Sequence, residues 1–147
     1  MPKKVKYKKR QKGNLKVKHK TAFVIKEKSR ISARLIALQS CMLTEKQLKS
    51  AKTTITKRLT RGDYRQNTTI FLDTPITKKP SETRMGKGKG NFSVWCSKVS
   101  KGSCIFEISG GRLKKCQNAL KSASKKLPIK TLTQTVIHNN NVKAGKR

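Results

Sequence analysis

Apolar residues recur at helical spacing in two stretches of the chain. In residues 44–61 the apolar positions lie three or four residues apart and share one helix face: Leu48, Ala51, Ile55 and Leu59. Thr44 and Gln47 form the T-x-x-Q capping box that begins a helix, and Gly62 supplies a stop. The pattern predicts an amphipathic helix over residues 44–61.

A second helix is predicted after the breaker Gly110-Gly111. Its apolar positions again follow helical spacing: Leu113, Cys116, Leu120, Ala123 and Leu127. Pro128 cannot continue a helix, because it lacks a backbone N–H and clashes with the preceding turn. The helix is therefore expected to end at Leu127.

Strand-like patterns lie between the two helices. Residues 68–72 predict a strand that ends at the turn Asp73-Thr74-Pro75. Residues 92–99 and 104–108, joined by a turn at Lys101-Gly102, predict a β-hairpin. The order helix, strand, long glycine loop, hairpin, helix predicts an α+β fold, a two-layer sandwich. We expect one domain over residues 21–136, a basic arm over 1–20 and a polar, basic tail over 137–147.

Charge narrows the class of protein. The 147 residues contain 38 lysines and arginines and 6 acidic residues, a formal net charge of +32. Such a chain repels itself, so a polyanion that neutralises it is expected, and nucleic acid is the commonest one. The apolar fraction of 33% predicts a small core. With no apolar run of about 18 residues, no membrane span is expected.

The first twenty residues contain ten basic residues and no acidic one. Two alternatives are a solvated tail and an organelle transit peptide, although the segment lacks serine and helical apolar spacing. We interpret it as an extended arm that lies along a phosphate backbone.

The chain offers little for catalysis or metal binding. Its four cysteines form no C-x-x-C pair, and only two histidines accompany them. Free thiols acting as small core residues are the favoured interpretation. The acidic residues are scattered singly, and Glu107 is interpreted as the partner of a nearby lysine. We expect no cofactor, no metal, no small-molecule substrate and no enzymatic activity.

A glycine–lysine loop is the most distinctive local motif: Arg84, Met85, Gly86, Lys87, Gly88, Lys89 and Gly90. Its glycine spacing fits neither the P-loop nor the dinucleotide motif. Alternate glycines allow positive φ and close approach to a backbone, while the lysines and the arginine carry charge for phosphates. The loop is interpreted as a phosphate-facing finger; the alternative is a flexible basic tip with no task.

Several motifs, in order over about residues 2–135, resemble the bacterial-type large-subunit ribosomal protein L-sixteen family. They include P-K-K-V-K-Y-K-K at residues 2–9, R-M-G-K-G-K-G at 84–90 and K-L-P-I-K-T at 126–131. Leu43-Thr44 at the helix start and Trp95 followed by Phe106-Glu107 also match.

This resemblance implies an α+β fold with a hammerhead-like antiparallel sheet and two helices. It implies a structural protein, not a catalyst, that binds large-subunit ribosomal RNA, contacts neighbouring ribosomal proteins and joins late in subunit assembly. It also implies that residues 84–90 point toward tRNA near the peptidyl transferase region. Anchoring to ribosomal RNA is expected from the cations of the arm and first helix: Lys3, Lys4, Lys6, Lys8, Lys9, Arg10, Lys12, Lys46, Lys57 and Arg58.

The chain also departs from the family pattern. Ser40-Cys41-Met42 replaces the usual glycines before the helix, and Gln66-Asn67 stand where apolar residues are usual. Together with the lysine-heavy composition and an arm that no presequence precedes, this favours an organelle-encoded protein of the mitochondrial matrix. Plastid and bacterial cytoplasm are the alternatives.

Two other function classes are weighed: a non-ribosomal RNA chaperone or packaging protein, and a nucleotide-dependent RNA-modifying enzyme. Repetitive basic tracts would favour the first, whereas here the basic loop lies between patterned strands, with Phe92 and Trp95 available as core. The missing phosphate motif disfavours the second.

Overall fold

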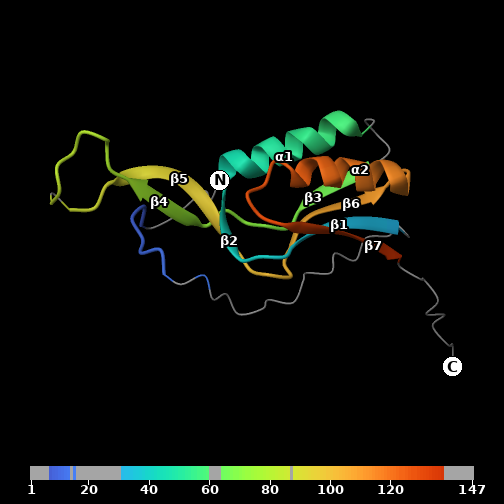
Figure 1. Ribbon diagram of the computed structural model, residues 1–147, viewed down its shortest axis with the longest axis horizontal. Helices are drawn as coiled ribbons and strands as arrows, with labels where there is room; N and C mark the ends of the chain where they lie inside the picture. Colours follow the sequence, from blue (N-terminus) through green and yellow to red (C-terminus); the bar gives the residue numbers. More distant parts are fainter. Residues whose placement is uncertain (1–6, 14, 16–30, 60–63, 87, 138–147) are drawn as a thin grey trace, which may run out of the picture.

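The computed structural model describes residues 7–13, 15, 31–59, 64–86 and 88–137. The described elements, in chain order, are β1 (Ile31–Ala37), β2 (Cys41–Thr44), α1 (Glu45–Arg58), β3 (Tyr64–Thr68), β4 (Thr74–Lys78), β5 (Asn91–Val99), β6 (Cys104–Gly110), α2 (Leu113–Ser124) and β7 (Thr131–Ile137). Figure 1 shows α1 and α2 together over one sheet, with β4 and β5 projecting from the body and carrying the glycine–lysine loop at their far end.

The strands form two antiparallel sheets. The first has the order β3-β6-β1-β7 and the second the order β2-β5-β4. α2 packs on the first sheet, while α1 packs beside α2 and also contacts β2 and β5 of the second. The predicted α+β sandwich is confirmed. The part of the chain that the structure describes has no helix long and apolar enough to cross a membrane.

The core lies between the two helices and the four-stranded sheet. Both predicted helix faces are confirmed, because Leu48, Ala51 and Ile55 of α1 and Cys116, Leu120 and Ala123 of α2 are buried. The sheet contributes Leu35 of β1 with Phe106 and Ile108 of β6. A fully buried side chain of this size contributes about 1.5–3 kcal/mol, so this layer holds most of the apolar stabilisation.

The first helix begins as its capping box predicts. The Thr44 N–H donates to Gln47 Oε1 (2.9 Å), and the Gln47 N–H donates to Thr44 Oγ1 (3.4 Å). The helix ends at Arg58, before the predicted limit, because Leu59 is extended with φ −108° and ψ 138°. α2 ends at Ser124, while Leu127 lies beyond it and is still buried.

The predicted strand at residues 68–72 is wrong. β3 ends at Thr68, and Asp73-Thr74-Pro75 leads into β4 instead of turning away. β3 reads Tyr-Arg-Gln-Asn-Thr and has a weak strand pattern of its own, but it pairs along its length with the apolar β6. Cross-strand packing decides strand position more than intrinsic propensity, and Pro75 is tolerated because β4 is an edge strand.

The predicted hairpin is also wrong, although both of its strands exist. β5 pairs with β2 and β4, whereas β6 pairs with β1 and β3, so the two strands enter different sheets. The turn between them does occur at Lys101-Gly102, with Gly102 at φ 84°. Apolar patterning identifies strands, but it does not identify their hydrogen-bonded partners.

Apart from β3, which the predicted strand at 68–72 overlaps only at Thr68, four described strands were not predicted: β1, β2, β4 and β7. β7 pairs with β1 throughout, for example Leu35 with Thr133, and so closes one side of the four-stranded sheet. Its sequence Thr-Leu-Thr-Gln-Thr-Val-Ile is rich in β-branched residues, which was the signal for a strand. β7 ends at Ile137, and the predicted tail beyond it lies outside the described residues. The predicted domain limits stay predictions.

Candidate nucleic-acid interface

The glycine–lysine loop extends from the paired strands β4 and β5. Its glycines have two separate physical roles. Gly86 and Gly88 adopt φ values of 92° and 70°, and an added Cβ at either would meet nothing within 4 Å. A Cβ at Gly90 would lie 2.6 Å from the carbonyl carbon and oxygen of Lys78. Gly86 and Gly88 therefore allow a left-handed backbone in open surroundings. Gly90 allows the backbone at the end of β4 to pack closely against it.

The described side chains of residues 84, 85 and 89 are exposed. Arg84 and Lys89 are exposed, and Met85 is 99% exposed. Lys79 Nζ donates a hydrogen bond to the Gly86 carbonyl, which ties the loop back to its own base. Lys87 lies outside the described residues. The loop thus presents cations and a bare backbone at the end of a strand pair.

Part of the N-terminal arm packs against this loop. Lys9 Nζ donates to the Lys89 carbonyl (3.3 Å), and Lys89 Nζ donates to the Arg10 carbonyl (2.8 Å). At the end of this segment, a Cβ on Gly13 would lie 3.4 Å from Lys98 Nζ of β5. The structure therefore brings together two of the predicted groups that are about eighty residues apart in sequence.

We call this combined region the arm–loop surface and define it by its described cations: Lys8, Lys9, Arg10, Lys12, Lys78, Lys79, Arg84, Lys89 and Lys98. Glu82 is the one acidic residue within residues 7–13 and 78–90. Lys3, Lys4 and Lys6 of the predicted set lie outside the described residues. Cations at this density suit a phosphate backbone, whose contacts set affinity and not base specificity.

An aromatic pair lies on β5 near the base of the loop. The rings of Phe92 and Trp95 have centroids 4.9 Å apart and are tilted by 50°. Phe92 is 36% exposed and Trp95 is half-buried, so neither belongs to the buried core cluster. The expectation that they form the core is wrong, because they lie in the part of β5 nearer the loop, whereas the buried residues Cys96 and Val99 lie toward its other end.

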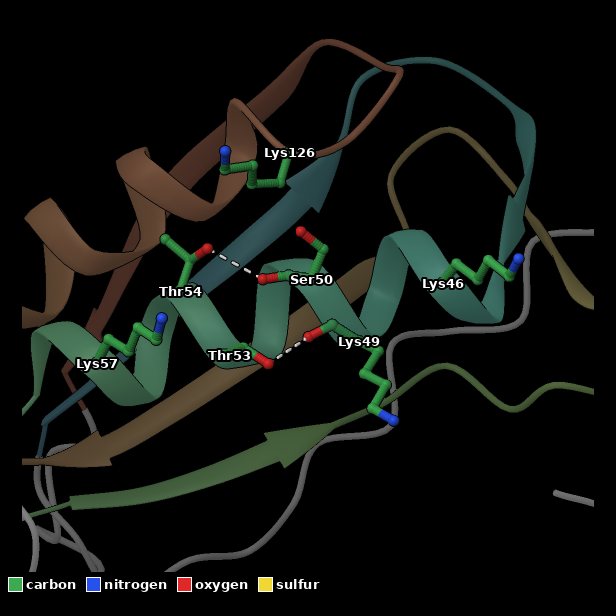
Figure 2. A pocket seen from close by; sticks show the side chains of 7 residues that line it. All are labelled: Lys46, Lys49, Ser50, Thr53, Thr54, Lys57 and Lys126. Carbon is green, nitrogen blue, oxygen red and sulfur yellow. Dashed lines mark hydrogen bonds between the residues drawn. The ribbon is translucent and has the colours of Figure 1, made fainter.

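A second basic region lies on the helices, and Figure 2 shows it from close by. It is a groove of about 450 Å³, which we call the helix groove, lined by Lys46, Lys49, Ser50, Thr53, Thr54, Lys57 and Lys126. Of the predicted helix cations, Lys46 and Lys57 line it; Arg58 is exposed but does not.

Lys49 and Lys126 were not predicted as part of this surface. The sequence does carry a signal for Lys49, because positions 46, 49, 50, 53 and 57 share one helical face. Lys126 had no such signal, since it reaches the groove from the turn after α2.

The remaining chemical groups belong to the core. The Arg34 Nε donates to Glu107 Oε1 at 2.7 Å, between neighbouring strands β1 and β6. The predicted lysine partner of Glu107 is therefore wrong, because the cross-strand register places an arginine opposite it. The four cysteines are free thiols, and burial raises the pKa of each: Cys41, Cys96, Cys104 and Cys116. Within the described ranges, no three His, Cys, Asp or Glu residues gather to hold a metal ion.

The fold and its two cation-rich surfaces define a small basic α+β protein whose exposed chemistry suits a polyanionic backbone. The family model for ribosomal protein L16p/L10e matches residues 2–134, and the chain belongs to this family. It is a structural ribosomal protein and not an enzyme.

Three bacterial proteins are among those to which the chain is similar. The chain is 41% identical over 131 residues to the large ribosomal subunit protein uL16 of Borreliella burgdorferi, covering 89% of this chain and 92% of the relative. It is 40% identical over 131 residues to uL16 of Borrelia garinii subsp. bavariensis, with the same coverage. For uL16 of Borrelia recurrentis, the identity is 41% over 130 residues, covering 88% of this chain and 91% of the relative.

Proposed function

We propose that this protein is a constituent of the large ribosomal subunit that binds ribosomal RNA through its arm and helix cations. Family membership supports this proposal, together with a net charge of +32 that only a polyanion balances well. Neighbouring ribosomal proteins are further partners in this proposal, which also includes a late place in subunit assembly.

We further propose that residues 84–90 support tRNA placement near the peptidyl transferase region. The observation that carries this is the reciprocal contact of Lys9 and Lys89 with backbone carbonyls. An ammonium group has three N–H donors, so Lys89 can hold the Arg10 carbonyl and still bind a phosphate oxygen. The arm thus supports a loop whose open glycines let a second backbone approach closely.

The test replaces Lys87 and Lys89 with alanine and measures ribosome assembly and tRNA accommodation separately. Subunits should incorporate the variant, while accommodation slows by about tenfold or more, because two ammonium groups that pair with tRNA phosphates are removed. The matched control is Lys114→Ala with Lys115→Ala, which removes the same charge from exposed positions of α2. Unchanged accommodation, or subunits that lack the variant, would contradict this role of the loop.

The compartment of this ribosome is a separate question. The mitochondrial location stays a prediction based on divergence and lysine content, while the bacterial relatives fit the alternative of a bacterial cytoplasm more directly. Detection of the protein in ribosomes from purified mitochondria would support the first, and its recovery from bacterial ribosomes would contradict it.

A further inference from the structure

The helix groove combines two kinds of polar chemistry. Four ammonium groups lie around it, from Lys46, Lys49, Lys57 and Lys126, and the hydroxyl-bearing residues Ser50, Thr53 and Thr54 lie between them. None of the described residues that line the groove is acidic. Positive charge alone would suit any polyanion, so the hydroxyl groups decide what the groove can distinguish.

The groove is built on a fixed platform. The opposite face of α1 is buried through Leu48, Ala51 and Ile55, which sets the direction of the groove residues. Lys126 is held from the other side, because its N–H donates to the Ala123 carbonyl (3.0 Å) and the next residue, Leu127, is buried. Core packing therefore fixes the backbone positions of the residues that line the groove.

Both threonine hydroxyl groups of the groove donate their proton to the backbone of α1. Thr53 Oγ1 donates to the Lys49 carbonyl (2.9 Å), and Thr54 Oγ1 donates to the Ser50 carbonyl (2.9 Å), as Figure 2 shows. A hydroxyl has one proton and two acceptor lone pairs. Because each proton is directed to the helix backbone, the oxygens offer only acceptor positions to a ligand.

We infer that the helix groove binds the sugar–phosphate backbone of RNA and distinguishes it from DNA. The lysines pair with phosphates, and the Thr53 and Thr54 oxygens accept hydrogen bonds from ribose 2′-hydroxyls, the donor that DNA lacks. This inference rests on the proposed function, which names ribosomal RNA as the partner. It deepens that function at the helix cations by naming the atoms of the groove that would give selectivity for RNA.

The first test compares an RNA duplex with the same duplex carrying 2′-fluoro riboses, which keep the A-form but cannot donate. The full-length protein should bind RNA about tenfold more tightly, as expected for two neutral hydrogen bonds. Thr53→Val with Thr54→Val should abolish this preference. The matched control is Thr56→Val: its hydroxyl also donates to a helix carbonyl, that of Lys52 (3.1 Å), but it does not line the groove. Equal binding of both duplexes by the unaltered protein would overturn the inference.

The second test concerns charge. Replacing the four groove lysines with glutamine should reduce the slope of log affinity against log salt by about three units, if each pairs with one phosphate. The control replaces four exposed lysines elsewhere, Lys52, Lys101, Lys114 and Lys115, and so has the same net charge. Equal slopes for the two variants would overturn the inference while leaving the proposed function intact.

Two further outcomes separate the alternatives. If the unaltered protein shows no salt-dependent binding to ribosomal RNA fragments, the proposed function fails and the groove inference fails with it. If the quadruple groove variant keeps its RNA slope but loses binding to polyglutamate, the groove fits an acidic peptide and the inference is wrong.

Discussion

A single ion pair illustrates how this fold stabilises charge inside a small core. Arg34 and Glu107 lie opposite each other on β1 and β6, with side chains only 13% and 5% exposed. Arg34 Nη2 has no hydrogen-bond partner among the described residues. With the arginine already short of partners, the carboxylate is its main electrostatic compensation, so removing the carboxylate should be costly.

We expect Glu107→Gln to lower the free energy of unfolding by about 3–5 kcal/mol, the cost typical of leaving one partner of a buried pair uncompensated. Urea denaturation followed by circular dichroism measures this. Glu82→Gln is the matched control, because it removes the same charge from an exposed loop position. Equal effects of the two substitutions would show that the buried pair contributes no more than a surface charge.

The thiols give a pH-dependent prediction at the same scale. Burial raises the pKa of Cys104 above its ordinary value of 9.0, and the other three cysteines shift in the same direction for the same reason. Above the unfolded pKa, the unfolded chain loses thiol protons that the folded chain keeps, so stability must fall as pH rises.

Replacing Cys104 with alanine should therefore flatten the fall in stability above about pH 9, relative to the unaltered chain. Urea midpoints measured from pH 7 to pH 10 test this. Because alanine also leaves a small cavity, the comparison is of slopes and not of absolute stability. A slope identical to that of the unaltered chain would contradict a raised thiol pKa at this position.

At the scale of elements, the glycine–lysine loop and the strands β4 and β5 act as one unit. Gly86 and Gly88 have positive φ in open space, while Gly90 lies against the backbone of Lys78. Glycine is thus needed for a positive φ at Gly86 and Gly88 and for close packing at Gly90. An added methyl group should therefore have different effects at these positions.

Gly90→Ala should destabilise the protein by about 1–3 kcal/mol, because its Cβ would meet the Lys78 backbone at 2.6 Å and force the strand pair apart. Gly86→Ala should cost about 1 kcal/mol, since its φ is strained but its surroundings are open and the loop can adjust. Thermal unfolding of the two variants gives the comparison. A larger loss for Gly86→Ala would mean that backbone conformation, and not close packing, dominates here.

At the scale of the whole molecule, two groups of described cations form the arm–loop surface and the helix groove. The arm carries ten of the basic residues within its first twenty positions, and its described part contacts the loop. The tail over residues 138–147 carries three, Lys143, Lys146 and Arg147. Electrostatic binding to RNA should therefore depend much more on residues 1–20 than on residues 138–147.

Removing residues 1–20 should flatten the slope of log affinity against log salt by several units, because each phosphate that the arm neutralises contributes about 0.7–0.9 to that slope. Removing residues 138–147 should change it by about two to three units at most. Filter binding to a ribosomal RNA fragment across a salt series measures both. Equal slopes for the two truncations would show that the arm neutralises no more phosphates than the tail.

The parts of this fold that the sequence predicted depend on local physics. Thr44 and Gln47 cap a helix because their partners lie within one turn, and the burial of Leu48, Ala51 and Ile55 follows from a spacing of three or four residues. The glycine–lysine loop could be located for the same reason, since alternate glycines determine their own backbone freedom.

Tertiary structure decided what depends on residues distant in sequence. Patterning could identify β5 and β6 as strands, but their partners lie in two different sheets, and β3 exists through its pairing with β6. The contact of Lys9 with the loop and the approach of Lys126 to α1 depend on how the chain returns on itself. The sequence by itself therefore determined the family motifs, the charge and the helices. Only long-range pairing could decide the sheets and the surfaces on which that charge gathers.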